Sequence, residues 1–455
     1  MIVRNEKILK KNADTDELLR KAEIIHQAIP ENGLFAEKAW RISPTPFPLD
    51  GKLVRTLEKL GPVFYRFQRT CDVIYRRSRK GSLPGWISGY LDRGKPPQLL
   101  DNGLAPNVVE TLPRVIRPDL ILTEEGFAVT ELDSVPGGIG LTAWLGKVYA
   151  KTSPCCEIIG GDSGMLDGFA SIFGPEGADI LVSVESGGYR PEMEWLAPQL
   201  PGNWRVESAE NYQISGRNVY RFFELFDLPN ISASEALAKE AAQGKVDVVS
   251  PFKPWIEEKM WAALFWSHPL RDVWRRELRE GNFRRLRALF PRSWVVDPAE
   301  IPHQAVIPGL DIQDFLELKE FSQTRRELVL KLSGFSERAW GARSVTIGQD
   351  ASRSEWAAAL DEAIESFQTS PYVLQEFHRG KLVTHPWINE ETGQVEWMEG
   401  RVRLCPYYFV NGGVNGGREV TLGGVLATIC PSDKKVLHGM RDAILAPCCD
   451  AGPAR

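Results

Sequence analysis

The spacing of the apolar residues changes several times along this chain, and these changes constrain its fold more than any other feature. Residues 53–78 repeat apolar side chains every three or four positions, which is typical of a long amphipathic helix. Residues 120–132 form two β-rich runs on either side of Gly126, which predicts a tight hairpin. Strands that alternate with helices across 160–255 predict a small, mostly parallel α/β lobe.

The final third of the chain has a different pattern. Apolar strand-like runs occupy 327–331, 372–375, 395–397, 401–410 and 424–429, which predicts an antiparallel sheet. Residues 445–455 contain proline, glycine and a pair of cysteines, so we expect this terminus to fray. Because 455 residues are too many for one ordinary core, these parts predict an α+β protein of several lobes, one of them α/β.

Composition excludes some classes of function and location. The net charge of −5 gives no electrostatic reason to expect nucleic acid or an anionic membrane as partner. The apolar runs are shorter than the roughly 20 residues that span a bilayer, and the charged N-terminus lacks the apolar core of a signal peptide. The seven cysteines include two adjacent pairs and no CxxC spacing, which is not the pattern of a disulfide framework. A cytoplasmic location fits these observations best.

Three acidic residues stand close together in the hairpin pattern. Glu131 and Asp133 are two residues apart at a strand end, so their side chains share one face. Asp119 precedes Glu131 by twelve residues, and a turn at Gly126 would bring it to the same end. Such a group suits Mg²⁺, which prefers a few carboxylates and phosphate oxygens, and Arg117 could contact a phosphate or a substrate carboxylate. Three solvated acids at a strand end are the alternative.

A lysine at the end of an apolar strand, followed by a Gly/Ser loop, forms a second pattern. Lys331 ends the run 327–331, and Ser333 and Gly334 begin the loop. Such a loop exposes backbone N–H groups to phosphate oxygens, and the lysine adds a point charge. The Walker A spacing GxxxxGK[ST] is absent, and glycine loops after strands are common, so this pattern is weak by itself.

A strand that leads into a polar pair forms a third pattern. The run 372–375 ends in Gln375, and Glu376 and Phe377 follow it. Backbone groups beside such a pair can bond the edge of an adenine base, and the carboxylate can take a ribose hydroxyl or an amino group. An ordinary edge strand is the alternative interpretation.

Two arginines on a later strand form the fourth pattern. Arg401 and Arg403 alternate along the strand, so they present two guanidinium groups on one face. Two such groups suit a polyphosphate or a developing acyl phosphate. Salt bridges to the acidic hairpin are the competing interpretation.

Together these patterns resemble the circularly permuted ATP-grasp superfamily, in particular its glutathionylspermidine synthetase-like and eukaryotic glutathione synthetase-like ligases. The family's metal-strand pattern, R-x-D followed by E-x-N and a proline, is matched by Arg117, Asp119, Glu131, Asp133 and Pro136. The family's loop glutamate, six residues after its lysine, is matched by Glu337 after Lys331. The adenine hinge corresponds to Gln375 and Glu376, and the later arginine strand to Arg403.

The resemblance implies a circularly permuted ATP-grasp fold, in which the nucleotide lies between two antiparallel sheets. It implies ATP and Mg²⁺ as cofactors, and the metal ligands would be Asp119, Glu131 and Asp133. The implied catalytic residues are Arg117, Glu337 and Arg403. The implied nucleotide-binding residues are Lys331, Ser333, Gly334, Gln375, Glu376 and Phe377. The reaction would join a carboxylate to an amine through an acyl phosphate. A kinase that releases a phosphorylated product and a catalytically inactive nucleotide-binding protein are the alternatives.

The chain also departs from the family pattern. Asp133 replaces the usual asparagine, and Leu332 replaces the proline after the lysine. The family's first ATP-binding lysine has no clear counterpart, although Arg292 and Lys319 lie near the expected position. Two segments, 218–221 and 254–259, resemble the substrate-lobe strands of the family. Candidate substrate-binding residues in the α/β lobe are Ser186, Tyr189, Arg190 and Arg221.

The predicted domains follow from these patterns. They are a helical region with the metal-binding hairpin (1–155), an α/β substrate lobe (156–255), a helical connection (256–320), an ATP-grasp lobe with the lysine loop and hinge (321–445) and a tail (446–455). The expected partners are a small-molecule or peptide carboxylate and an amine, without nucleic acid or membrane. A homodimer is an open alternative, because related folds are often dimers.

Overall fold

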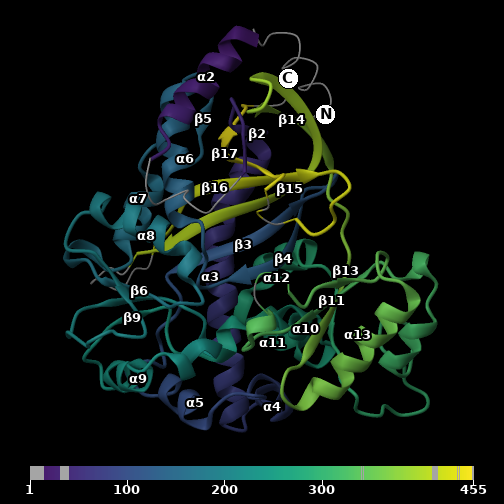
Figure 1. Ribbon diagram of the computed structural model, residues 1–455. Coiled ribbons are helices and arrows are strands. Elements are labelled where there is room, and N and C mark those ends of the chain that lie inside the picture. The colour runs from purple at the N-terminus through teal and green to yellow at the C-terminus, as the bar shows by residue number, and fades with distance from the viewer. Residues whose placement is uncertain are drawn as a thin grey trace.

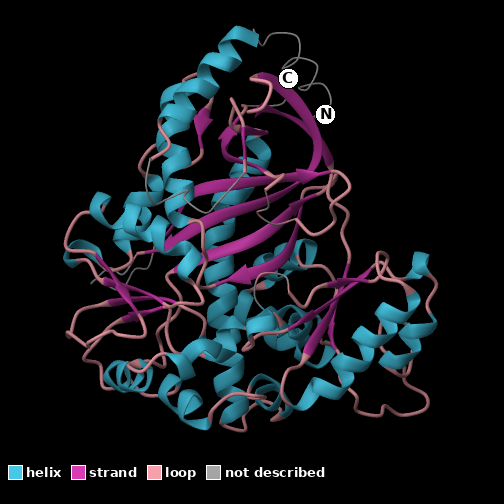
Figure 2. Ribbon diagram, viewed as in Figure 1, coloured by secondary structure: helices cyan, strands magenta, loops and turns pink. Residues whose placement is uncertain are grey.

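The computed structural model describes residues 15–30, 40–339, 341, 343–411, 419–437, 439 and 441–452. A nine-stranded sheet dominates this part of the chain (Figure 1, Figure 2). Its strands are β1 (Arg41–Ile42), β2 (Phe47–Leu49), β3 (Val115–Leu122), β4 (Phe127–Asp133), β5 (Glu157–Ile158), β14 (Leu382–Asn389), β15 (Gln394–Val410), β16 (Val420–Pro431) and β17 (Ile444–Asp450). The main order is β1-β17-β16-β15-β3-β4; β14 pairs with β15, and β2 and β5 pair with β17.

The helix α3 (Gly51–Arg79) packs against this sheet (Figure 1). Asp50 begins the helix, since its side chain accepts hydrogen bonds from the N–H groups of Lys52 and Leu53. The apolar stripe of α3 is buried in one core with the sheet side chains Val402, Leu404 and Tyr408. The helix predicted at 53–78 is therefore confirmed, because its apolar face is covered by the sheet.

The α/β lobe contains a parallel four-stranded sheet, as the alternation of strands and helices predicted. Its order is β7-β6-β8-β9. The strands are β6 (Asp179–Val182), β7 (Arg205–Ser208), β8 (Val219–Phe222) and β9 (Val248–Val249). The helices of this region are α6 (Ile139–Thr152), α7 (Gly164–Ser171), α8 (Arg190–Leu196) and α9 (Ser234–Ala242).

A further sheet, which is antiparallel throughout, has the order β10-β13-β11-β12. Its strands are β10 (Ser293–Val295), β11 (Leu328–Leu332), β12 (Thr346–Ile347) and β13 (Tyr372–Glu376). Trp356 and Leu360 of α13 (Arg353–Glu365) are fully buried against it. The strands expected in the final third thus divide between two sheets, because β14 to β17 join the hairpin β3–β4 in the larger one.

The remaining helices surround these sheets. They are α2 (Thr15–Gln27), α4 (Trp86–Leu91), α5 (Pro97–Gly103), α10 (Met260–Trp266), α11 (Arg271–Leu278) and α12 (Glu280–Leu289). No helix of the described residues is long and apolar enough to cross a membrane.

The chain end differs from two expectations. Residues 445–450 do not fray, since they belong to β17, which pairs with β16, β1, β2 and β5 and is buried over most of its length. Cys156 and Cys449 form a disulfide across 293 positions of sequence. One bridge therefore forms where the sequence predicted no disulfide framework, and the cysteines no longer argue for a reducing compartment.

Candidate functional site

A cavity of about 1020 Å³ lies among the three sheets. One wall is the face of the large sheet formed by β3, β4, β15 and β16. Strands β11 and β13 and the loop after β11 form another wall, and residues 224–226 of the α/β lobe contribute a third. A cavity of this size can hold a small-molecule ligand as large as a nucleotide. The resemblance implies a ligand between two antiparallel sheets; this cavity is bounded by the large sheet, which is mixed, and by the antiparallel sheet of β11 and β13.

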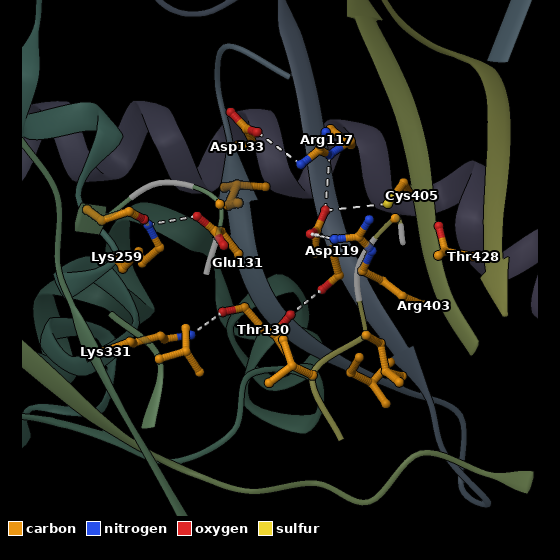
Figure 3. A pocket seen from close by; sticks show the side chains of 18 of the residues that line it. Arg117, Asp119, Thr130, Glu131, Asp133, Lys259, Lys331, Arg403, Cys405 and Thr428 are labelled. Atoms are coloured by element: carbon orange, nitrogen blue, oxygen red, sulfur yellow. Dashed lines mark hydrogen bonds and ion pairs between the residues drawn. The ribbon is translucent and has the colours of Figure 1, made fainter. Parts of the chain in front are cut away.

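The hairpin β3–β4 carries the predicted acidic group. Arg117 pairs with Asp133 across the two strands, and Asp119 pairs with Glu131. A β-bulge follows Asp119 and changes the register there. All four side chains line the cavity (Figure 3). The prediction that the turn near Gly126 brings Asp119 beside the other two acids is therefore confirmed.

Asp119 forms ion pairs with two arginines. Its carboxylate accepts hydrogen bonds from Nε of Arg117 and Nη1 of Arg403, each at 3.0 Å, and from the thiol of Cys405 at 3.5 Å. Burial favours the protonated form, but the two guanidinium groups outweigh it, so the pKa of Asp119 is lowered. The alternative of salt bridges between the arginine strand and the acidic hairpin is confirmed for Arg403. Arg401 instead bonds to backbone carbonyls.

The other two acids also have cationic partners. Asp133 accepts a hydrogen bond from Nη2 of Arg117 at 3.0 Å and one from the N–H group of Val135 at 2.8 Å. Burial raises the pKa of Asp133; Arg117 opposes this shift, and the charge of Glu131 adds to it. Glu131 forms an ion pair with Lys259, with 2.8 Å between Oε1 and Nζ.

These contacts decide how well the site fits a metal. Among the residues that the structure describes, no three His, Cys, Asp or Glu side chains are grouped to hold an ion. A Mg²⁺ ion beside the predicted ligands would be repelled by Arg117, Arg403 and Lys259, which already neutralise them. As placed, the three carboxylates do not fit a preformed magnesium site.

Lys331 lies opposite the hairpin (Figure 3). Its ammonium donates hydrogen bonds to the backbone carbonyl of Thr130 at 2.6 Å and to Oε1 of Gln375 at 3.0 Å. Lys331 is 6% exposed, and this burial lowers the pKa of its ammonium to about 8. The charge of Glu131 opposes the shift, and the neighbouring Lys259 adds to it.

The predicted hinge lines the same cavity. Gln375 accepts a hydrogen bond from Lys331, and its amide nitrogen donates one to the hydroxyl of Ser293 at 3.1 Å. Glu376 and Phe377 follow at the end of β13 and also line the cavity. Gln375 therefore contacts Lys331 directly, and the binding of adenine by this segment stays a prediction.

The loop after β11 agrees with the predictions only in part. Gly334 lines the cavity, and a Cβ atom there would approach the carboxylate of Glu258 to 3.0 Å. Ser333 is fully buried and does not line the cavity. Its hydroxyl donates a hydrogen bond to the carboxylate of Glu258. Glu337 is exposed and also outside the lining. The geometry therefore does not support a nucleotide contact by Ser333 or a catalytic role for Glu337.

Among the candidates in the α/β lobe, Tyr189 lines the cavity. Ser186, Arg190 and Arg221 do not; Arg221 is fully buried and ion-paired with Glu257, which is part of the lining. Arg292 and Lys319, which lie near the position expected for a first lysine, are outside the lining as well.

Sequence reasoning missed several residues that the fold brings into the cavity, among them Glu224, Glu257, Lys259, Cys405 and Thr428. Burial raises the pKa of Glu224 to about 8, and the charge of Glu257 adds to this shift. The segment 254–259 did resemble a substrate-lobe strand, and this was the available signal for Glu257 and Lys259, although Pro254–Glu257 forms a 3-10 helix. The other residues stand in patterns that many proteins share.

Comparison with known proteins supports the fold. No family model matches the chain, and no curated protein matches it. A solved structure of a glutathione synthetase-like effector (GSS30) from Globodera pallida, in apoform, is similar over 96% of this chain and 98% of that one, with a TM-score of 0.55 and 12% identity. A candidate gamma-glutamylcysteine synthetase from Methylobacillus flagellatus KT aligns over 83% of this chain and 85% of that one, with a TM-score of 0.33 and 10% identity. The chain thus has a glutathione synthetase-like α+β fold.

Proposed function

We propose that this chain is an ATP-dependent ligase that joins a carboxylate to an amine. The observation that carries the proposal is Lys331, a buried ammonium whose hydrogen-bond partners, among the described residues, are neutral oxygens. A buried cation without a carboxylate partner is costly. An anionic ligand in the cavity, such as the phosphates of ATP, would offset this cost. The likeness to a glutathione synthetase-like effector supports a ligase-type reaction.

The cavity residues suit acyl transfer through a phosphorylated intermediate. Lys331, Arg117 and Arg403 would stabilise negative charge as the γ-phosphoryl group of ATP passes to a substrate carboxylate, which releases ADP. An amine then attacks the carbonyl carbon of the acyl phosphate, an amide bond forms, and inorganic phosphate leaves. The segment 375–377 would hold the adenine. Positioning and electrostatics supply the rate enhancement in this scheme.

The α/β lobe side of the cavity suits the amine. Glu224 and Glu257 both line it, and Tyr189 of the same lobe also belongs to the lining. Glu224, whose pKa of about 8 leaves it protonated at neutral pH, would ionise beside a bound ammonium, and Glu257 shares its charge with Arg221. We therefore assign this side to the amine substrate and the large sheet to the carboxylate and phosphates. The identity of both substrates and a homodimeric state stay predictions.

A second candidate function is nucleotide binding without turnover. The observation that favours it is the ion pair between Glu131 and Lys259, together with the arginines on Asp119 and Asp133. A site whose carboxylates are neutralised by the protein's own cations can bind phosphates without Mg²⁺. Such a protein would bind ATP and release no ADP.

Calorimetric titration with ATP tests both functions. Wild type should bind ATP, and Lys331→Met should lose about tenfold or more in affinity, because an ion-assisted hydrogen bond is removed. Lys147→Met is the matched control, since Lys147 also donates to a glutamine, Gln199, but lies outside the cavity. Repeating the titration with Mg²⁺ and with a chelator measures the metal requirement that the resemblance implies.

A screen of acid and amine pairs for ADP release then separates the candidates. Release that requires both an acid and an amine supports the ligase. Release with the acid alone indicates the kinase reaction, and binding without release indicates the inactive protein. Absence of ATP binding by wild type would rule out all three.

A further inference from the structure

The face of the large sheet that lines the cavity changes from charged to apolar along a row of paired residues. Arg403 on β15 pairs with Thr428 on β16, and Thr428 pairs with Leu445 on β17. Paired residues of neighbouring strands point to the same face of a sheet, and all three residues line the cavity. Leu426, two residues before Thr428 on the same strand, shares this face and also lines the cavity. The row therefore leads from a guanidinium group, through a hydroxyl group, to two leucines.

Two buried polar atoms in this row are unpaired. Nε of Arg403 and Oγ1 of Thr428 form no hydrogen bond within the part of the chain that the structure describes. Figure 3 shows the two side chains on neighbouring strands, and Thr428 is fully buried. Nη1 of Arg403 is bonded to Asp119, whereas all three nitrogens of Arg117 have protein partners. Because unpaired buried polar atoms are costly, a ligand oxygen that accepts hydrogen bonds from Nε and Oγ1 would remove this cost.

Apolar side chains surround the other end of the row. Leu426 and Leu445 belong to one core cluster with Leu141 of α6, and Trp40 packs against that cluster. The start of α6 lies over Leu426, because a Cβ atom at Gly138 would approach Cδ2 of this leucine to 3.9 Å. Leu141 and Trp40 also line the cavity. A ligand whose oxyanion lies at the polar centre of the row would therefore have its carbon chain against leucine and tryptophan side chains.

From this arrangement we infer that the large-sheet end of the cavity binds a monocarboxylic acid with an apolar chain or ring, through Arg403, Thr428 and the apolar side chains around Leu426. The inference rests on the proposed function in taking this acid to be the acyl substrate. One carboxylate oxygen accepts the hydrogen bonds from Nε and Oγ1, and the other is left for the γ-phosphoryl group. A second carboxylate on the chain would be buried among apolar side chains, which is costly. Dicarboxylic acids and acidic peptides are therefore disfavoured as substrates.

Ligand-observed NMR titrations of the full chain test the choice of acid. The probes are acetate, pentanoate and glutarate, of which the last two have equal numbers of carbons. Each methylene that is buried should tighten binding roughly fourfold, so pentanoate should bind about tenfold or more tightly than acetate. Glutarate should bind at least about tenfold more weakly than pentanoate. Equal or tighter binding of glutarate would overturn the inference and point instead to Arg441, an exposed arginine of the lining.

Thr428→Val tests the contact with the carboxylate. The variant should bind pentanoate about tenfold more weakly, because a hydrogen bond to a charged group is lost. Its thermal unfolding midpoint should be unchanged or higher, since the hydroxyl has no partner among the described residues. A lower midpoint with unchanged binding would show a purely structural role. Thr421→Val is the matched control, because Thr421 lies on the same strand but is exposed and outside the lining.

Leu426→Phe tests the apolar end. The larger ring should fill part of this end, so pentanoate should bind about tenfold more weakly while acetate stays within about threefold of wild type. Leu422→Phe is the control, since Leu422 lies on the same strand outside the lining. Unchanged affinity for pentanoate in Leu426→Phe would overturn the placement of the chain. If this variant does not fold, the order of the three acids in wild type still decides.

The outcomes separate the inference from the proposed function. If wild type binds ATP but none of the three acids, with or without ATP, the inference fails, and the screen for ADP release still decides the function. If wild type binds the acids in the expected order but no ATP, the proposed function fails and the acid site stands. ADP release that requires pentanoate and an amine, and that glutarate does not support, would agree with both.

Discussion

The pKa of Lys331 makes anion binding depend on pH within an accessible range. Its ammonium has a pKa of about 8, below the ordinary lysine value, so it is ionised at pH 7 and loses its proton as the pH rises through 8. Anions bind the ionised form. From pH 7, where the terminal phosphate of ATP is already ionised, to about pH 7.5 the affinity for ATP should change little. Above pH 8 it should fall toward a tenfold loss per pH unit, and the ionisation of Glu224 in the same cavity acts in the same direction.

Calorimetric titrations at several pH values measure this slope. Lys331→Arg is the informative variant, because a guanidinium stays ionised throughout this range. Its affinity should decline less than that of wild type between pH 7 and 9. Equal slopes for the two proteins would show that another group titrates.

At the residue scale, local patterns predicted part of the site. Asp119 and Glu131 were predicted to lie side by side because the turn of a hairpin fixes which residues of its two strands face each other, and they do pair in the structure. Lys331 was found because it ends an apolar strand. The geometry does not support the assignment of Ser333 to the nucleotide, since its hydroxyl donates a hydrogen bond to the buried Glu258. That contact joins residues 75 positions apart, and no local pattern indicates it.

At the element scale, the packing of α3 on the large sheet depends on a glycine. A Cβ atom at Gly61 would lie 2.6 Å from Cδ1 of Tyr408 and 2.9 Å from Cγ1 of Val420. Gly61→Ala should therefore destabilise the protein by about 1–3 kcal/mol through overpacking, despite the better helix propensity of alanine. The shift in the thermal unfolding midpoint measures this effect.

Gly89→Ala is the matched control for that substitution. Gly89 lies inside α4, and no atom stands within 4 Å of its added Cβ. This variant should gain roughly 0.5–1 kcal/mol, since alanine loses less backbone entropy in a helix. Shifts of the two midpoints in the same direction would contradict the packing argument for Gly61.

The elements were predicted where one pattern runs without interruption. The helix α3 and the strand β4 have such patterns and were found nearly to their ends, whereas β3 begins five residues before the predicted run at 120–122. The strand β15 was predicted as two runs, 395–397 and 401–410, because Gly400 interrupts the apolar pattern. It is one strand, since its backbone pairs with β14 and β16 through Gly400. The close approach of β16 explains the glycine, because a Cβ there would lie 2.4 Å from the carbonyl oxygen of Cys430.

At the scale of the whole molecule, the site exists only where distant segments meet. One cavity is lined by segments that lie far apart in the sequence. They are the hairpin 115–133, the residues 224 and 257–259, the strand 328–332, the hinge 375–377 and the strand 394–410. Sequence patterns can identify each segment but not the distances among them. The ion pair that most affects the site, between Glu131 and Lys259, joins two segments that the sequence assigned to different lobes. Its effect on metal binding could not be predicted from either segment.

The disulfide between Cys156 and Cys449 ties the segment after α6 to the final strand β17, and it should stabilise the whole fold. A bridge across 293 positions restricts the unfolded chain strongly, so its loss should cost about 2–5 kcal/mol. Cys156→Ser should lower the thermal midpoint without reductant, and dithiothreitol should bring wild type down to the same value. Cys155→Ser is the control, because Cys155 is an exposed free thiol beside the bridge. Denatured, unreduced wild type should show five reactive thiols rather than seven. Seven reactive thiols, with a midpoint that dithiothreitol does not change, would mean that β17 is held by its backbone pairing and packing alone.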